Sequence, residues 1–268
     1  MKNFFQTIIN NIPPLPESVM QIERLAKDPD ATYRDMADLL HQDPLVCSEI
    51  LKAANSPLYG FSREIKTLES AISLFGIGTV RGFVLAVYIR ENFNFNLDAY
   101  GITSKHFSYT ANRHHAFTVA WYLRHNPSLF DVLSPAAFLS NLGQVLISQY
   151  LIEHNIVAPF KKALLSTIDI ATIEREFCDT TTVALSAEIF DAWSLDDRLV
   201  CTLRYMDNPL QASECDILTA QILQCVHTLI PYNGLITEKS FAEAKKLVEQ
   251  YHLDMPRFLK ALDKFQEC

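Results

Sequence analysis

The sequence predicts an all-α protein, and three observations lead to that prediction. Gly accounts for only 7 of the 268 residues, whereas folds rich in tight turns use Gly where the backbone needs a positive φ. Hydrophobic residues make up 49% of the chain, which is enough for a sizeable core and too many for a disordered chain. Apolar residues recur at helical spacing through most of the chain, and strand signals are weak.

The first part, residues 12–91, is expected to form a compact half of five short helices. Its Pro-rich start at residues 12–16 cannot be helix interior, because Pro lacks a backbone N–H and clashes with the preceding turn. Capping residues, Pro and Gly then mark the helix ends. The expected helices are one at residues 16–27, one after the N-cap Thr32 with Asp35, one from Asp43 and Pro44 to Asn55, one at residues 67–75 before Gly76, and one at residues 80–89.

The second part, residues 102–209, follows a less periodic connection at residues 92–101 and is expected to form a second helical half. The residues beyond it, 210–268, are expected to form a C-terminal extension of two or three helices. Within the second half we expect a long helix at residues 104–125, a helix at residues 136–154 capped by Ser134 and Pro135, and shorter helices at residues 160–166, 170–177, 182–193 and 197–206.

Charge and cysteine content narrow the range of partners and compartments. The formal net charge is −8 and no run of Lys or Arg exceeds two residues, which disfavours binding to nucleic acid and to anionic membranes. The six cysteines form no Cys-x-x-Cys pair, as is usual for reduced thiols in the cytosol. Residues 1–11 lack a signal-peptide profile, and no window of 18 apolar residues exists. We therefore expect a cytoplasmic protein without a membrane span.

The order and spacing of a set of residues in the first half resemble the HDOD family, a bacterial-type group of signalling domains. The matching residues are Pro14-Leu15-Pro16, Asp28-Pro29, Asp43-Pro44, Leu51, Ala54-Asn55-Ser56, Tyr59-Gly60, Ile65, Ala71-Ile72 and Leu74-Phe75-Gly76. The resemblance covers residues 12–209 and is closest before residue 100, so the predicted HDOD domain spans residues 1–209. It implies a bundle in two packed halves that is related to the HD-domain phosphohydrolases and serves regulation.

The resemblance also identifies the positions at which an HD-domain phosphohydrolase holds its metal. His114 matches the first ligand. The remaining ligand positions hold Ser140 and Asn141, Thr182, and Met206 with Asp207. Hydroxyl, amide and thioether groups are poor ligands for the divalent cation of a hydrolase, so only His114 survives, with Asp207 a marginal addition. One or two ligands do not make a catalytic site, and we expect no metal and no cofactor.

The loop after residue 54 is the most distinctive local feature of the sequence. Asn55, Ser56, Tyr59 and Gly60 can form a helix end and a turn for purely structural reasons. Alternatively they form a contact surface, either between the two halves or with a partner, with the amphipathic Tyr59 as its anchor. Together with His114 and Asn141, these four residues are the candidates for partner or ligand binding.

The leading hypothesis is a non-enzymatic regulatory module that binds a signalling protein or a small signalling molecule. No segment of the sequence resembles an output domain, so we expect the module to act through a separate partner. The alternative is a divergent metal-dependent phosphohydrolase that acts on a nucleotide, for which His114 would be a ligand. A nucleic-acid binder is a third hypothesis, and it would show steep salt dependence. The sequence does not determine the oligomeric state.

Overall fold

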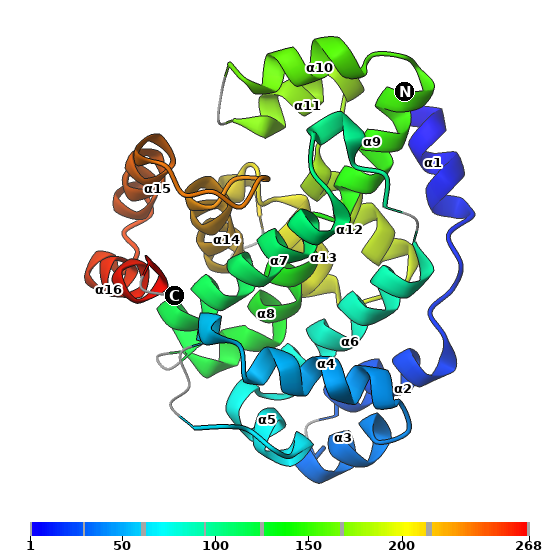
Figure 1. Cartoon of the computed structure of the whole chain (residues 1–268), viewed down its shortest axis with the longest axis vertical. Helices are drawn as coiled ribbons and strands as arrows, with labels where there is room; N and C mark the ends of the chain where they lie inside the picture. Colours follow the sequence, from blue (N-terminus) through cyan, green and yellow to red (C-terminus); the bar gives the residue numbers. More distant parts are fainter. Residues whose placement is uncertain are drawn as a thin grey trace.

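The structure is a computed structural model, and it describes residues 2–28, 30–59, 63–93, 95–123, 126–166, 169–212 and 216–266. Every regular element in these ranges is helical, so the predicted all-α class is confirmed. The N-terminal half gathers at the lower end of Figure 1, and the C-terminal extension lies along the left side of the bundle.

The first four expected helices of the N-terminal half begin and end close to the residues that the sequence indicates, whereas the one expected at residues 80–89 is three residues longer at each end. The helices of this half are α2 (Glu17–Ala26), α3 (Tyr33–Leu40), α4 (Pro44–Ala54), α5 (Leu68–Phe75) and α6 (Ile77–Asn92). Thr32 and Asp35 form a capping box at the start of α3, and the Asp43 carboxylate accepts hydrogen bonds from the first backbone N–H groups of α4. Gly76, with φ of 79°, separates α5 from α6.

The two halves meet where α6 of the first lies against α8 of the second. The helices of the second half are α7 (Ser104–Thr118), α8 (Phe130–Leu139), α9 (Gly143–Glu153), α10 (Val157–Leu164), α11 (Ile170–Cys178), α12 (Thr182–Ala192) and α13 (Asp197–Arg204). Short helical turns connect them, namely η1 (Pro57–Tyr59), η2 (Asp98–Tyr100), the π-helix η3 (Val119–Leu123), η4 (Pro127–Leu129) and η5 (Pro209–Gln211).

Three of the expected boundaries were wrong. An additional helix, α1 (Lys2–Asn10), precedes the Pro-rich segment and packs against α12. The expected helix at residues 104–125 is α-helical only to Thr118 and continues as a π-helix to Leu123, while Arg124 and His125 lie outside the described residues. The expected helix at residues 136–154 is two helices, because α8 starts at Phe130 with Pro135 inside it and a turn at residues 140–142 precedes α9.

The stretch Phe130–Glu153 is long and apolar enough to meet the length and hydropathy criteria for a membrane span, which differs from the expectation that no such stretch exists. However, 94% of its most apolar window is buried inside the protein. This stretch is α8 and α9, which occupy the centre of the bundle (Figure 1). A buried core helix has the same composition as a span, because both exclude water on all sides.

The C-terminal extension consists of α14 (Ile217–Leu229), α15 (Glu238–Gln250) and α16 (Met255–Gln266). α14 is in contact with α7, α8, α13 and α15, and its residues Ile222, Leu223 and Val226 are fully buried. The extension is therefore packed into the second half, and α14 supplies one wall of the site described next.

Candidate functional site

His114 and Asn141 lie together in the centre of the second half. His114, on α7, is fully buried, and its Nε2 is 2.7 Å from the carbonyl oxygen of Ile230. Because that oxygen can only accept, Nε2 carries the proton and Nδ1 is the acceptor. Asn141, in the turn between α8 and α9, places its Nδ2 3.4 Å from this Nδ1. The structure thus brings two of the candidate residues together, and both ring nitrogens of His114 face groups of the protein.

A second histidine, His227 of α14, lies against His114. The two ring centroids are 3.9 Å apart, and Nε2 of His227 is 2.8 Å from the Ser140 hydroxyl. Burial lowers the pKa of His114 to about 4 and lowers the pKa of His227 well below its usual value, with His114 contributing further to the latter. Both imidazoles are therefore neutral at pH 7, which allows them to stack without charge repulsion.

Thr182, at the start of α12, is held by a buried carboxylate. Glu174 of α11 accepts a hydrogen bond of 2.6 Å from the Thr182 backbone N–H, another of 2.6 Å from the Thr182 hydroxyl, and one of 2.8 Å from Tyr100. Burial raises the pKa of Glu174 to about 7, although these three hydrogen bonds favour the anion. Glu174 is thus a group whose charge changes near neutral pH.

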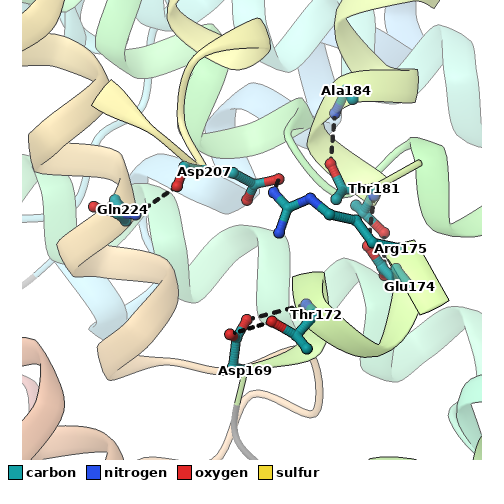
Figure 2. Close-up of polar contacts among 9 residues, drawn as sticks. Asp169, Thr172, Glu174, Arg175, Thr181, Ala184, Asp207 and Gln224 are labelled. Carbon is teal, nitrogen blue, oxygen red and sulfur yellow. Dashed lines mark hydrogen bonds and ion pairs between the residues drawn. The ribbon is translucent and has the colours of Figure 1, made fainter. Parts of the chain in front are cut away.

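Asp207, in the turn after α13, forms an ion pair with Arg175 of α11, with 2.9 Å between Oδ2 and Nη2. Figure 2 shows the guanidinium beside this carboxylate, and Gln224 of α14 reaching the backbone oxygen of Asp207 at 3.1 Å. Burial raises the pKa of Asp207, while a hydrogen bond with Thr181 and the Arg175 charge oppose that increase. Met206 is buried next to it in the sequence.

Several of these side chains, but not His114 or Ser140, line a cavity of about 600 Å³ between α9, α11, α12, α14 and α15, which we call the polar cavity. Among the residues that line it are Asn141, Gln144, Glu174, Thr182, Asp207 and His227. The side chain of Gln144 is buried, and its Oε1 has no hydrogen-bond partner among the described residues. A buried acceptor without a donor is costly, so Gln144 marks a position where a polar ligand can bind.

The model of the HDOD domain matches residues 12–209. The chain belongs to the HDOD family. Solved structures with the same fold include a virulence factor from Campylobacter jejuni, which is 26% identical, with 100% of this chain and 99% of that chain covered and a TM-score of 0.59. A candidate phosphohydrolase from Shewanella amazonensis is 17% identical, with coverage of 97% and 93% and a TM-score of 0.66.

Two further similar proteins are longer than this chain. A candidate signal transduction protein from Marinobacter aquaeolei is 19% identical, with 96% of this chain but only 59% of that chain covered and a TM-score of 0.67. An uncharacterized protein from Treponema pallidum is 27% identical over 79 residues, which are 30% of this chain and 15% of that protein. The HDOD chain described here therefore spans only part of the length of these two relatives.

The side chains at the metal positions of this HDOD chain are a poor donor set for a hydrolytic metal. Ser140, Asn141 and Thr182 offer neutral oxygen or nitrogen atoms that already form hydrogen bonds within the protein. His114 donates its Nε2 proton to a carbonyl oxygen, and Asp207 is neutralised by Arg175. Within the described residues, no three His, Cys, Asp or Glu side chains converge closely enough to hold a metal ion.

The HDOD loop residues lie apart from the polar cavity. Asn55 ends α4, and its amide exchanges two hydrogen bonds of 2.8 Å with the backbone N–H and oxygen of Ile65, so it closes the base of the loop. The Ser56 hydroxyl accepts a weak 3.4 Å hydrogen bond from the Leu58 N–H. Gly60 lies outside the described residues.

Tyr59 joins the two halves of the HDOD domain. Its hydroxyl lies 2.6 Å from Nδ1 of His115 on α7, and Nε2 of His115 lies 2.8 Å from the Ser134 hydroxyl on α8. Burial lowers the pKa of His115 to about 3, so the ring is neutral, with one nitrogen donating and the other accepting between the two hydroxyls. This is a contact between the two halves, which was one of the alternatives that the sequence left open for Tyr59.

Two residues of the polar cavity were missed by sequence reasoning. His227 lies in the extension, which the family resemblance does not cover, although its place beside Leu223, Val226 and Ile230 puts it on the apolar face of α14. Glu174 lies on the apolar face of α11 with Ile170, Phe177 and Cys178, which was the signal available for it. Its hydrogen-bond donors come from two other elements, which the sequence of α11 does not indicate.

Proposed function

We propose that this HDOD chain is a non-enzymatic regulatory module whose polar cavity binds a small polar molecule and reports its presence to a separate protein partner. The observation that supports this proposal is that two features occur side by side in the second half. The residues at the former metal positions are neutral or paired within the protein, while the cavity of about 600 Å³ beside them keeps an unsatisfied buried acceptor, Gln144. This volume is typical of small-molecule sites.

The charges around the polar cavity favour a neutral or zwitterionic ligand. Four carboxylates line it, those of Asp169, Glu174, Asp207 and Glu243, against the three basic groups of Arg175, Lys239 and Lys246. Two of the basic groups are already in ion pairs, Arg175 with Asp207 and Lys246 with Glu243. A polyphosphate needs a clear excess of positive charge, which this lining does not provide.

The binding experiment measures unfolding midpoints in the presence of amino acids, nucleosides and nucleotides. A ligand at 100 times its Kd stabilises the folded state by about 2.7 kcal/mol. We expect stabilisation by a neutral or zwitterionic compound, and its loss in Gln144→Met, which removes the unsatisfied acceptor at similar volume. The matched control is Gln149→Met on the exposed face of the same helix. Equal ligand effects in both variants would contradict the assignment to this cavity.

The alternative function is a divergent metal-dependent phosphohydrolase, and one experiment separates it from the proposal. Purified protein is titrated with Mn²⁺, Zn²⁺ and Fe²⁺, and phosphate release from nucleotides is followed in parallel. If the proposal is correct, we expect no stoichiometric binding of a metal ion that depends on His114. One equivalent of bound metal that is lost in His114→Ala, together with metal-dependent phosphate release, would overturn the proposed function in favour of the hydrolase.

A further inference from the structure

A second cavity, of about 610 Å³, lies between the two halves of the HDOD domain. Its walls come from α4, α6 and α7, with contributions from the ends of α8 and α9. None of its lining residues lines the polar cavity, so the two are separate. We call it the inter-half cavity.

The interior of the inter-half cavity is mainly aromatic and aliphatic. The rings of Phe83, Phe95, Phe107 and Phe138 line it. On α6, Ala86 is half-buried although its neighbours Leu85 and Val87 are buried, which shows where the cavity reaches this otherwise enclosed helix. An apolar chain inserted here would exchange contact with water for contact with these carbon atoms.

The lining also includes a group of basic side chains. Lys52, Arg90 and Lys105 line the cavity, and Glu49 is the only acidic residue among its described lining residues. The Glu49 carboxylate is shared, with 3.0 Å to Lys52 Nζ and 2.8 Å to Arg90 Nη1. Lys105 has no carboxylate partner in the part of the chain that the structure describes. The lining is therefore positive in a chain whose formal charge is −8.

We propose that the inter-half cavity binds an amphiphile of the fatty-acid type, with its alkyl chain among the four Phe rings and its carboxylate at Lys105 and Lys52. The apolar interior selects the chain. The ammonium group of Lys105, which has no carboxylate partner among the described residues, and that of Lys52, which shares Glu49 with Arg90, select a single anionic head. A free acid fits better than the acyl chain of a membrane lipid, because the cavity accommodates a small molecule and the acidic chain disfavours an anionic bilayer.

The test uses the full chain and a series of alkanoates below their micelle concentrations. Octanoate, decanoate and dodecanoate are titrated by calorimetry. We expect one molecule bound per chain and an affinity that rises about fourfold for each added methylene until the cavity is filled. Dodecan-1-ol, which has the same chain and no charge, is expected to bind at least about tenfold more weakly than dodecanoate.

Variants assign the two ends of the ligand. Lys105→Gln is expected to weaken dodecanoate binding at least about fivefold and to leave dodecanol binding unchanged, whereas Lys162→Gln on the exposed face of α10 leaves both unchanged. Ala86→Phe fills the cavity and is expected to abolish binding. Ala53→Leu, on the opposite wall, serves as a second cavity-filling variant if the first does not retain its helical circular dichroism.

Three results would overturn the proposal. The first is the absence of saturable dodecanoate binding to the wild-type chain. The second is an affinity within about twofold of wild type in Lys105→Gln and in a folded cavity-filling variant, because the ligand would then lie elsewhere. The third is binding to phosphatidylglycerol vesicles without binding to the free acids, which would point to a bilayer surface. The outcome is independent of the function proposed for the polar cavity.

Discussion

Replacement of Glu174 by Gln tests whether a titrating carboxylate is built into the wall of the polar cavity. The pKa of Glu174 is raised by burial to about 7 from 4.5, so the folded state binds its proton more tightly than the unfolded state does. Between these two values the folded chain therefore carries more protons, and the contribution of Glu174 to stability falls as the pH rises from about 4.5 to about 7. The full difference corresponds to about 3 kcal/mol.

Gln fits the same hydrogen-bond arrangement without the charge. Its amide oxygen can accept from the Thr182 backbone N–H, while its amide nitrogen donates to the hydroxyls of Tyr100 and Thr182, which can rotate to accept. The stability of Glu174→Gln relative to wild type is therefore expected to increase by about 2.5 kcal/mol between pH 5 and pH 8, since the wild type alone bears the cost of a buried charge at the higher pH.

The assay is urea unfolding of both proteins at pH 5, 6, 7 and 8. Glu176→Gln, at an exposed position two residues further along α11, is the matched control and is expected to give a difference that does not vary with pH. If the curves for Glu174→Gln and wild type run parallel over this range, the carboxylate does not change its charge there, and the account of the Glu174 environment is wrong.

Three further predictions concern the rest of the buried polar network. Tyr59→Phe leaves Nδ1 of the buried His115 without its hydrogen-bond partner and is expected to cost about 1–3 kcal/mol in urea unfolding, whereas the exposed Tyr33→Phe is expected to cost little. Gly143→Ala would place a Cβ 2.1 Å from the Thr182 carbonyl oxygen, so about 1–3 kcal/mol should be lost as α9 and α12 move apart; unchanged stability would contradict this close approach. In Glu174→Gln, acidification from pH 7.5 to 5.5 should cost about 3 kcal/mol through His114 and His115 and more through His227, because the lowered pKa of each means that the folded state binds fewer protons below about 6.5, and a flat profile would refute their neutral burial.

Local capping chemistry made the N-terminal half predictable from the sequence. Thr32 with Asp35, Asp43 and Thr67 each satisfy backbone N–H groups within three residues, so the signal and the structure that it creates are adjacent in the chain. The family resemblance likewise rested on turns and caps of this kind. It assigned His114, Asn141, Thr182 and Asp207 to the positions of a single metal site. Of these four, Asn141, Thr182 and Asp207 line the same cavity.

The features that were missed depend on contacts between distant residues. α1 has only nine residues, and it is held by ring contacts of Phe4 and Phe5 with Tyr150 on α9, at 5.1 and 5.3 Å between centroids. The break between α8 and α9 falls at Ser140, Asn141 and Gly143, a turn-type cluster that the long apolar stretch around it outweighed in the prediction. It is stabilised by the Ser186 hydroxyl, which accepts a hydrogen bond from the Gly143 backbone N–H and donates one to the backbone carbonyl oxygen of Ser140.

The residues at the positions that the family resemblance assigns to metal ligands form hydrogen bonds within the protein, and these hydrogen bonds stabilise this part of the second half. Ser140 forms a hydrogen bond with His227, and Asn141 forms one with His114. Thr182, the first residue of α12, donates its hydroxyl hydrogen bond to Glu174. A metal ligand at any one of these positions would have to displace a buried hydrogen bond and leave its partner unsatisfied, at a cost of about 1–3 kcal/mol each. His227 comes from the extension, so α14 contributes an imidazole that stacks on His114. α14 of the extension and residues 140, 141 and 182 thus form one connected set of polar contacts. In an HD-type metal site a cation would connect these helices, whereas here hydrogen bonds and ring stacking within the protein connect them.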